Sequence, residues 1–498
     1  MKILKELLKD IEYQLINGHL DNEISGIFYD SRNCIEESLF IAVPGMSVDG
    51  HNFISQAIKG GAKTIIVSQD VKVAENITLI KIKDPRKSMA ILGRNFYDNP
   101  STKMKVVGIT GTNGKTTTIH ILKSIYENAG YKVGLIGTIG ASIGETTIPC
   151  NNTTPESIDL QRILAVMVSQ RVDYCFIEVS SHALALDRIY GTTIYAAMFT
   201  NLSPDHMEFH KDMEDYYNTK KKLFLIPEKF NIINIDDPWG KRLFEELKES
   251  NSSLHTFGLE AQANFIGKNI EYTPFGIKYE IQGPKVSGKV SLKIPGKVNV
   301  YNSLTAASFA LTDNIPFHIV SEGIGKIKGV KGRFETVYKN DNYQVVIDFA
   351  HTEDGLKEVI SSLRLFTKGR IILVFGVYAP SEDKGREKRL AMGRVASEYA
   401  DILIVTSDNP KNQDQEFIIK EIIEGIKSFD NDKIIYSNSD RKEAIEKAIS
   451  MVLKDDLILI AGKGHESAQI IGNVAVPFNE KEIVLETVEK NKNKAGLK

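Results

Sequence analysis

The sequence has few cysteines, no long apolar run and almost no net charge, and each absence excludes a class of protein. Only three cysteines occur among 498 residues, too far apart for a disulfide framework or a CxxC metal pair. No apolar stretch approaches the roughly 20 residues that a helix needs to cross a bilayer. Lysine and arginine number 62 against 64 aspartates and glutamates, so no overall basic field attracts nucleic acid or an acidic membrane. We therefore expect a cytoplasmic protein without nucleic-acid or membrane partners, in which any anionic ligand is held by local sites.

The sequence has enough hydrophobic residues for several globular cores. Hydrophobic residues make up 42% and charged residues 25%, as in soluble globular proteins. At roughly 150 residues per domain, the length indicates about three domains. Short β-rich runs, each followed by a helical pattern, occur at residues 64–67, 105–109, 345–347 and 371–375. This alternation predicts the α/β class.

Two turn-rich segments, 99–103 and 329–332, mark the predicted domain boundaries. The predicted domains are residues 1–103, 104–330 and 331–488, followed by a tail at 489–498. The tail is rich in lysine and asparagine, and we expect it to fray. The first residues of the chain predict an amphipathic helix. Its apolar side chains are Ile3, Leu4, Leu7, Leu8 and Ile11.

A glycine-rich loop follows the expected strand 105–109 and precedes a helical pattern. Its residues are Gly111, Thr112, Asn113, Gly114, Lys115, Thr116 and Thr117. In this context the glycines let backbone N–H groups close around phosphate oxygens, Lys115 reaches the outer phosphates and Thr116 can ligate magnesium. The strict phosphate-loop pattern has glycine where this chain has Ile109, so the loop is a variant. A structural glycine turn that happens to precede a lysine is the weaker interpretation, and we predict ATP and Mg²⁺ as cofactors.

Six further motifs follow this loop. They lie at residues 178–182, 200–206, 234–238, 332–335, 348–352 and 462–466. Together with the loop, and in this order, they resemble the motifs of the Mur ligases, which add amino acids to the peptidoglycan precursor. The resemblance extends over nearly the whole chain. It implies a three-domain α/β architecture with a central P-loop ATPase domain and a C-terminal Rossmann-like domain, and we expect a monomer.

The resemblance implies an amide ligase that uses ATP. Such an enzyme phosphorylates a carboxylate and lets an amine attack the acyl phosphate, so charge neutralisation is its main task. The implied catalytic residues are Lys115, Lys220, His206 and Arg333. The implied magnesium ligands are Thr116, Glu178, His206 and a carboxylated Lys220, in which the cationic amine has become an anionic carbamate.

Each of these residues also has a simpler interpretation. A lone histidine such as His206 is more often structural than a ligand. The three lysines at 220–222 would ordinarily form a solvated face, and Arg333 could form a salt bridge in the domain linker. Their places in the order of motifs favour the catalytic interpretation. The residues that resemble the family's contacts to the nucleotide are Asn234, Asp237 and Asp348.

The N-terminal run at residues 29–32 is followed by motifs at 39–45 and 49–53. It resembles the UDP-sugar domain of the ligases that add the third peptide residue. This resemblance implies that UDP-N-acetylmuramoyl-L-alanyl-D-glutamate is the acceptor, held by hydroxyl and guanidinium groups. The implied contacts are Ser31 to the uridine diphosphate, and Asn152, Thr153, Thr154, Ser180 and Arg188 to the muramoyl dipeptide.

Two departures from the family pattern leave the incoming amino acid open. The selectivity motif 407–411 ends in Lys411, where the meso-diaminopimelate ligases usually have arginine, and lysine offers a point charge instead of a fork of donors. Near Ser381 and Glu382 the arginine usual in the family is missing, and an acidic Glu382 would suit a cationic side chain. The implied contacts to lysine, meso-diaminopimelate or another amino acid are Asp408, Asn409, Lys411, Gly462 and Glu466.

Three other functions are alternatives. A folylpolyglutamate synthase shares the chemistry and a related two-domain core but lacks the N-terminal run at 29–32. A duplicated ligase could bind UDP-muramyl peptide or ATP without catalysis, although none of the central residues has decayed. A P-loop motor or regulatory GTPase would lack the motifs at 408–411 and 462–466.

Overall fold

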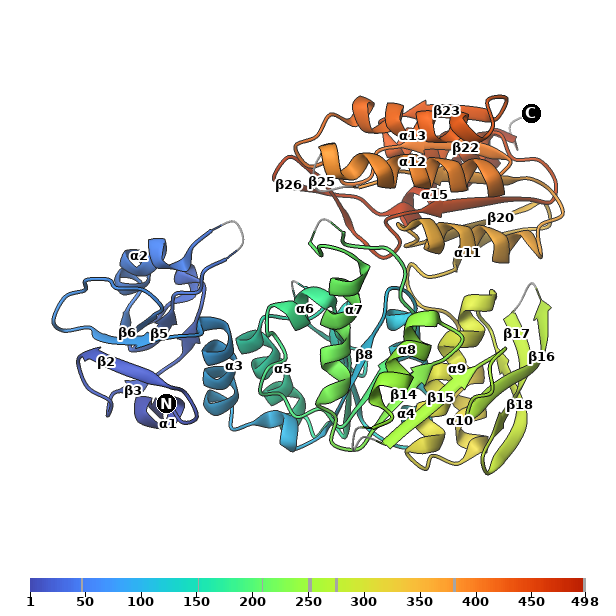
Figure 1. Ribbon diagram of the computed structural model, residues 1–498. Coiled ribbons are helices and arrows are strands. Elements are labelled where there is room, and N and C mark those ends of the chain that lie inside the picture. Colours follow the sequence, from blue (N-terminus) through green and yellow to red (C-terminus); the bar gives the residue numbers. More distant parts are fainter. Residues whose placement is uncertain are drawn as a thin grey trace.

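The computed structural model describes residues 1–498 except 46–47, 151, 208, 250–252, 274–275, 379–381 and 496–498. Three larger sheets follow one another along the chain, each with helices packed against it (Figure 1). None of the helices in the described ranges combines the length and the apolar character that crossing a membrane requires.

The N-terminal sheet has five strands in the order β2-β7-β6-β5-β4, which are parallel except for β2. Its strands are β2 (Tyr13–Asn17), β4 (Ile27–Phe28), β5 (Ser38–Ile41), β6 (Ala62–Val67) and β7 (Thr78–Ile82), and β1 (Lys2–Ile3) pairs with β3 (Glu23–Ile24). Its helices are α1 (Leu4–Leu7), α2 (Ile54–Lys59) and α3 (Pro85–Phe96). The expected strand at 64–67 is confirmed as part of β6.

The first residues differ from the expected amphipathic helix. Only α1 is helical, and the chain turns at Asp10, whose φ of 65° lies in the left-handed region. A residue in that conformation cannot continue a right-handed helix, and the residues that follow pair with β7 instead. The apolar side chains still reach the core, since Leu4, Leu7 and Leu8 are buried.

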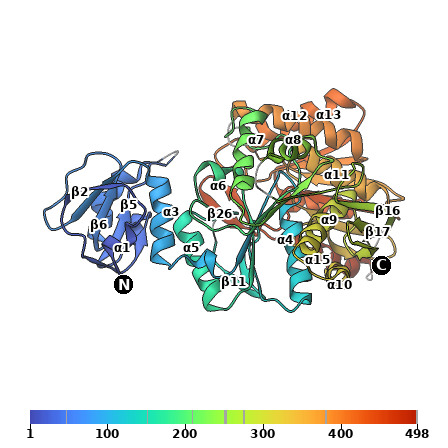
Figure 2. The same ribbon diagram turned by 60° about the horizontal axis from the view of Figure 1, so that its bottom comes forward.

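Helix α3 connects the N-terminal sheet to the rest of the molecule. Asp84 caps it by accepting a hydrogen bond from a backbone N–H of its first turn, and Pro85 supplies a preset φ at its start. Leu92 of α3 shares a core with Ile158 of α5 (Ser157–Ser169). Figures 1 and 2 both show α3 between the N-terminal sheet and α5. The N-terminal sheet is thus joined to the central one through this helix pair.

The central sheet has eleven strands in the order β11-β10-β9-β12-β8-β13-β14-β15-β16-β17-β18, parallel from β9 to β16 and antiparallel towards both ends. Its strands are β8 (Lys105–Thr110), β9 (Val133–Gly137), β10 (Gly140–Ile143), β11 (Thr146–Ile148), β12 (Tyr174–Glu178), β13 (Ala196–Phe199), β14 (Phe230–Asn234), β15 (Ser253–Gly258), β16 (Phe265–Thr273), β17 (Gly276–Gly283) and β18 (Val286–Leu292). Its helices, besides α5, are α4 (Lys115–Asn128), α6 (Ser181–Ala185), α7 (Met213–Lys221), α8 (Pro238–Leu247), α9 (Lys297–Thr312) and α10 (Phe317–Lys326).

Strand β8 lies in the middle of this sheet and is buried on both faces. Val107 and Ile109 belong to the core with α4, α9 and α10, whereas Val106 belongs to the core with α5, α7 and α8. Alternate side chains of one strand therefore serve two cores, which explains why the strand is apolar almost throughout. The expected strand at 105–109 is confirmed.

The C-terminal sheet has six strands in the order β19-β20-β24-β21-β22-β23, parallel except for β19. Its strands are β19 (Glu335–Lys339), β20 (Tyr343–Asp348), β21 (Ile371–Phe375), β22 (Ile402–Thr406), β23 (Ile434–Asn438) and β24 (Asp456–Ala461), and β25 (Ala468–Ile471) and β26 (Val474–Pro477) form a hairpin beside them. Its helices are α11 (Glu353–Arg364), α12 (Glu382–Tyr399), α13 (Gln415–Phe429), α14 (Arg441–Ser450) and α15 (Glu480–Ala495). The expected strands at 345–347 and 371–375 are confirmed, and the arrangement is Rossmann-like.

Helix α15 continues to Ala495, through most of the segment 489–498 that we expected to fray. Val484 and Val488 anchor the helix in the core of the C-terminal sheet. Beyond them Lys492 lies 3.7 Å from Glu489, one turn earlier. Such pairs support a helix at its solvated end, and composition alone did not reveal this continuation.

A buried ion pair holds α14 and α15 together. Arg441 and Glu480 are both almost inaccessible to solvent, and the guanidinium lies 2.7 Å from the carboxylate. Arg441 also donates to the carbonyl oxygens of Ser407 and Ala461. Ser407 directly follows β22 and Ala461 ends β24, so the ion pair also fixes the backbone at the carboxyl edge of the sheet.

We expect Arg441→Met to lower the free energy of unfolding of the C-terminal domain by about 3–5 kcal/mol, because Glu480 would be left buried without its cation. The double variant Arg441→Met/Glu480→Met should lose clearly less. The exposed Arg242, which pairs with Glu214, provides the control, and Arg242→Met should cost no more than about 1 kcal/mol. Thermal and urea unfolding measure all three, and equal losses in the single and double variants would contradict the assignment.

Candidate active site

The phosphate loop predicted from the sequence lies at the carboxyl edge of the central sheet. Strands β8, β12, β13 and β14 are neighbouring and parallel, so the loops that follow them meet at one edge. This edge is where parallel α/β sheets bind ligands. Gly111–Gly114 follows β8, and the motifs at 178–182, 200–206 and 234–238 follow the other three strands.

Two glycines of the loop have backbone conformations and neighbours that exclude a side chain. Gly111 has a φ of 147°, and a Cβ there would lie 1.9 Å from the Thr200 hydroxyl. Gly114 has a φ of 88°, and a Cβ there would lie 2.2 Å from the Asn302 side-chain oxygen. Gly114 also starts α4, so the N–H groups of the first turn of this helix are directed at the space above the loop.

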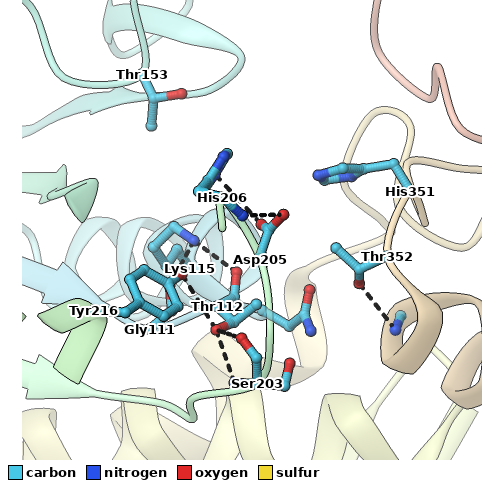
Figure 3. Close-up of polar contacts among 12 residues, drawn as sticks. Gly111, Thr112, Lys115, Thr153, Ser203, Asp205, His206, Tyr216, His351 and Thr352 are labelled. Atoms are coloured by element: carbon cyan, nitrogen blue, oxygen red, sulfur yellow. Dashed lines mark hydrogen bonds and ion pairs between the residues drawn. The ribbon is translucent and has the colours of Figure 1, made fainter. Parts of the chain in front are cut away.

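The loop is held by the segment that follows β13. The Thr200 hydroxyl donates to the carbonyl of Asn113, and the Asn113 N–H donates to the side chain of Asn201. The Thr112 hydroxyl donates to the Ser203 carbonyl and accepts from the Ser203 N–H, as Figure 3 shows. The motif at 200–206 therefore fixes the shape of the phosphate loop before any ligand is present.

Two lysine amines converge on one carbonyl oxygen of this loop. Lys115 donates to the carbonyls of Gly111 and Thr112 at 2.8 Å each, and Figure 3 shows it folded back over the loop. Lys220, which is buried, donates to the same Gly111 carbonyl at 3.1 Å and lies over the ring of Tyr216. Burial lowers the pKa of both amines, and the charge of Lys115 lowers that of Lys220 further, well below its ordinary value. Lys220 therefore loses its proton more readily than an ordinary lysine.

Glu178, at the end of β12, is fully buried. Its two carboxylate oxygens accept from the N–H and the hydroxyl of Thr138, at 3.0 Å each. The Thr138 hydroxyl also lies 3.2 Å from that of Thr153. Burial lowers the pKa of His465, in the motif at 462–466, to about 4, and the Thr138 backbone partly offsets this. Thr138 thus contacts the expected metal ligand and the expected acceptor motif.

His206 lies beside a buried carboxylate. Its ring is 3.3 Å from Asp205, and its φ of 55° places a non-glycine residue in the left-handed region. Burial raises the pKa of Asp205, but the nearby positive charges of His206, His351, Lys388 and Lys115 outweigh it and hold the pKa at about 2. Asp205 is therefore a permanent anion, which attracts cationic groups of the C-terminal domain to this edge (Figure 3).

The donors expected for magnesium fit a hard cation only in part. The carboxylate of Glu178 and the hydroxyl of Thr116 are the oxygen types that Mg²⁺ prefers. Over the described residues, however, no group of three or more His, Cys, Asp or Glu side chains is placed to hold a metal. A magnesium ion at this edge would therefore take its remaining ligands from hydroxyls, water, nucleotide phosphates or a modified lysine.

Arg333 brings the C-terminal domain to the phosphate loop. Its guanidinium donates to the Thr116 hydroxyl at 3.4 Å and stacks on the ring of Phe349. Its buried Nε has no hydrogen-bond partner among the described residues, which leaves a donor for a ligand. Asp348 accepts from two backbone N–H groups, including that of Phe334, and so holds the turn that carries Arg333.

The turn before Arg333 crosses another loop of the same domain at very short range. A Cβ on Gly332 would lie 2.1 Å from the His465 nitrogen, and one on Gly464 would lie 2.7 Å from the Gly332 carbonyl. Both glycines have positive φ, 67° and 53°. The linker to the C-terminal domain and the loop 462–466 are therefore locked together.

The expected acceptor residues surround the end of β12. Thr154 donates to the Glu178 carbonyl and accepts from the Ser180 N–H, and Ser180 caps α6. Arg188 donates to the Thr154 carbonyl and pairs with Glu156 at 2.7 Å, while its Nε is buried without a partner. The carbonyl of Asn152 accepts from the Cys150 thiol. Ser31 lies in the N-terminal domain, where it donates to the side chain of Gln56.

Asn234 and Asp237, the expected adenine neighbours, already have partners within the protein. Asn234 donates to the Thr200 carbonyl at 2.7 Å. Asp237 caps α8 and accepts from the Leu202 N–H. Both residues therefore position the 200–206 segment, whatever they contribute to a nucleotide.

The expected amino-acid residues meet in the C-terminal domain. Asn409 donates to Glu466 at 2.9 Å, and a Cβ on Gly462 would lie 3.0 Å from Asp408. Lys411 donates to the hydroxyl of Tyr378 at 2.8 Å and lies over its ring. Ser381 lies outside the described residues, as does the side chain of Glu382.

Sequence reasoning brought most of these residues together but overlooked two connecting ones. Thr138 lies in no motif, and a lone threonine after a strand carries no signal. Lys463 lies inside the motif 462–466, yet its fully buried amine contacts Asn409 and Glu466. The signal in the sequence was that Lys463 is a charged residue between two glycines of an expected binding motif.

Comparison with known proteins places this arrangement in a family. Three family models match the chain: the Mur ligase family catalytic domain at residues 23–97, the Mur ligase middle domain at 109–310 and the Mur ligase glutamate ligase domain at 332–464. A relative from Clostridium acetobutylicum, named UDP-N-acetylmuramoyl-L-alanyl-D-glutamate–2,6-diaminopimelate ligase 1, is 46% identical over 488 residues, which cover 98% of this chain and 99% of the relative. The chain belongs to the Mur ligase family. It is accordingly an ATP-dependent ligase that forms amide bonds.

Solved structures agree with this membership. A structure of a UDP-N-acetylmuramoyl-L-alanyl-D-glutamate–2,6-diaminopimelate ligase covers 99% of each chain with a TM-score of 0.69 and 26% identity. A folylpolyglutamate synthase from Mycobacterium tuberculosis covers 76% of this chain, with a TM-score of 0.63 and 17% identity, and shares the fold alone. The alternative of a folylpolyglutamate synthase is therefore not favoured for this Mur ligase.

We expect Gly111→Ala to weaken the binding of ADP by at least about tenfold, because the added Cβ would displace Thr200 and with it the carbonyls and N–H groups of the loop. Gly130→Ala is the matched control: Gly130 also has a positive φ, 87°, but a Cβ there meets nothing within 4 Å. Isothermal titration with ADP compares the two variants. Native affinity in Gly111→Ala would show that the crowding of the loop is unimportant.

Proposed function

We propose that this Mur ligase joins 2,6-diaminopimelate to UDP-N-acetylmuramoyl-L-alanyl-D-glutamate, with ATP converted to ADP and phosphate. The contacts of Thr138 carry the proposal, since this residue donates to Glu178 and its hydroxyl lies 3.2 Å from that of Thr153. The residues expected at the metal and at the acceptor thus adjoin one another. The names of the full-length relatives support the choice of substrates.

The reaction has two steps, and residues at this edge of the sheet can assist both. An oxygen of the acceptor's glutamate side-chain carboxylate attacks the γ-phosphorus, and the bond from this phosphorus to the ADP oxygen breaks. The amine of the amino acid then attacks the acyl carbon and phosphate leaves. Negative charge develops near the phosphate loop in both steps. The Lys115 amine can turn from the carbonyls of Gly111 and Thr112 to the phosphates and stabilise this charge. Arg333 can add the planar donors of its guanidinium.

Magnesium, when bound, would neutralise phosphate charge and fix the attacking and leaving oxygens. Thr116, Glu178 and His206 are the residues we assign to it, together with a carboxylated Lys220. The lowered pKa of the Lys220 amine supports this last assignment, because only a deprotonated amine adds to CO₂. The carbamate formed would place a negative charge beside the Lys115 amine.

The proposed division of labour follows the three sheets. Residues 1–103 hold the uridine diphosphate through Ser31, 104–330 hold ATP, metal and the muramoyl dipeptide, and 331–488 hold the amino acid. Asn152, Thr153, Thr154, Ser180 and Arg188 are the proposed contacts to the dipeptide. Asn234, Asp237 and Asp348 are those proposed at the nucleotide. All these residues belong to one chain, and we propose a monomer that acts in the cytoplasm.

Lys411 bears most directly on which amino acid the enzyme adds. A lysine offers one cation for the distal carboxylate of diaminopimelate, and its bond to Tyr378 limits where that cation lies. L-Lysine is the second candidate, favoured by the acidic Glu382 where the family's arginine is expected.

Phosphate release is the decisive measurement for this function. We expect release from ATP only when the UDP-muramyl dipeptide and an amino acid are both present, with meso-diaminopimelate turned over at least about tenfold more efficiently than lysine, ornithine or neutral amino acids. Turnover with lysine alone would reassign the amino acid. Absence of turnover with the whole panel would favour a non-catalytic paralogue.

Lys220→Ala should abolish ligation and be partly rescued by a small added carboxylic acid, which can replace the carbamate in the cavity. Lys115→Ala is the matched control, because it should abolish ligation without such rescue. The mass of intact native protein in bicarbonate buffer gives an independent readout, with a gain of one CO₂. Full activity of Lys220→Ala without any additive would overturn the carbamate assignment.

A further inference from the structure

The amino-acid motifs of the C-terminal domain are joined by a buried lysine to which no role has been assigned above. The side chain of Lys463 is inaccessible to solvent, although it lies in a glycine-rich loop. Its ammonium donates to Asn409 Oδ1 at 2.9 Å and to Glu466 Oε2 at 2.7 Å, and it lies 3.7 Å from Asp408 Oδ1. One buried cation therefore contacts three residues expected to bind the amino acid.

The same ammonium fixes the orientation of the Asn409 amide. Asn409 Oδ1 accepts from Lys463 and from the Ile470 N–H, so its Nδ2 is directed to Glu466, to which it donates at 2.9 Å. The hairpin β25–β26 closes the arrangement, since Gln469 donates to the Asp408 carbonyl at 2.7 Å. The loops 408–411 and 462–466 are thus connected through Lys463 at their centre and through the hairpin at their side.

The charges in this cluster require a cation at its centre. The Asp408 side chain is buried, whereas that of Glu466 is 31% exposed, and their carboxylates lie 3.7 and 2.7 Å from the Lys463 amine. Two carboxylates on the same buried amine would repel each other without its charge. Arg441 lies near Asp408, but its guanidinium is already bonded to Glu480 and to two carbonyls. Lys463 is therefore the cation that holds Asp408 and Glu466 together in one pocket.

We propose that Lys463 is a positioning residue that determines the affinity for the incoming amino acid, by fixing Asp408, Asn409 and Glu466 in one geometry. The inference rests on the proposed function, because it takes these three residues to be the amino-acid pocket. Lys463 itself has its donors directed at protein oxygens. It acts on the affinity for the amino acid, because its contacts, Asp408, Asn409 and Glu466, all lie in the loops 408–411 and 462–466.

The test compares Lys463→Met with Lys447→Met, which removes an exposed lysine of the same domain that lies over Tyr436. Steady-state phosphate release is measured while each of the three substrates is varied in turn. In Lys463→Met we expect the KM for the amino acid to rise at least about tenfold, the value of one lost charge-assisted bond, with kcat and the other two KM values within about twofold of native. Lys447→Met should match the native enzyme.

The pH dependence provides a second readout that a merely structural role would not move. Burial raises the pKa of Asp408, while Arg441, Lys463 and Lys388 lower it and Glu466 raises it. Without Lys463 the carboxyl stays protonated to a higher pH. The loss of amino-acid affinity on acidification should therefore begin at a higher pH in Lys463→Met than in the native enzyme.

The variant Lys463→Arg keeps the charge, and we expect its KM for the amino acid to lie between those of the native enzyme and Lys463→Met. If Lys463→Met fails to fold, Lys463→Met/Glu466→Gln, which removes opposite charges together, is compared with Glu466→Gln. If the KM for the amino acid in the double variant exceeds that in Glu466→Gln by less than about threefold, this result supports action of Lys463 through Glu466. An unchanged amino-acid KM in folded Lys463→Met, or a parallel rise of all three KM values, overturns the inference. Failure of the native enzyme to turn over would instead reject the proposed function.

Discussion

The amines of Lys115 and Lys220 donate to the same oxygen, the carbonyl of Gly111, and much of the central domain serves to make this possible. Positive charge on one of these buried amines disfavours it on the other, and a Cβ at Gly111 would collide with Thr200. The segment after β13 clamps the loop, and Asn234 and Asp237 hold that segment. The protein itself therefore holds the loop in shape, with its lysines placed to meet negative charge.

The three domains contribute to this edge in different ways. The central sheet supplies fixed groups at the ends of parallel strands, whereas the C-terminal domain supplies Arg333 on a linker turn and the amino-acid residues on two loops. Asp205, an anion at every physiological pH, attracts cationic residues of the C-terminal domain such as Lys388. The N-terminal domain is attached by the packing of α3 on α5, and it carries one of the proposed site residues, Ser31.

Much of the fold could be predicted from the sequence because its strands are continuous apolar runs. Strand β8 is such a run, and the glycines behind it have no other explanation than a loop with positive φ. The short α1 could not be predicted, since the apolar spacing of the first residues suits a helix and only the backbone at Asp10 breaks it. The continuation of α15 was missed for the opposite reason: its end is polar, yet Val484 and Val488 hold its start in the core.

The proposed site residues could be chosen from the sequence where a residue type is chemically distinctive or stands in a motif that resembles the family's. Lys115 and Glu178 are of the types that phosphate and metal chemistry requires, and Lys220 was chosen by its place in such a motif. Thr138 could not be chosen, because a threonine gains its importance only from the groups around it. The sequence shows that Lys411 departs from the family pattern, but its partner Tyr378 is found only by distance.

The crossing of Gly332 with the loop 462–466 bears on the order of events that the proposed roles imply. A Cβ on either glycine would collide with the other loop, so the two backbones pack directly on each other. The turn that carries Arg333 and the loop that carries Glu466 therefore form one packed unit of the C-terminal domain. With the roles proposed for these residues, the group for the phosphate and the group for the amino acid would reach the central domain together, and an acyl phosphate would be formed in the presence of the amine that consumes it.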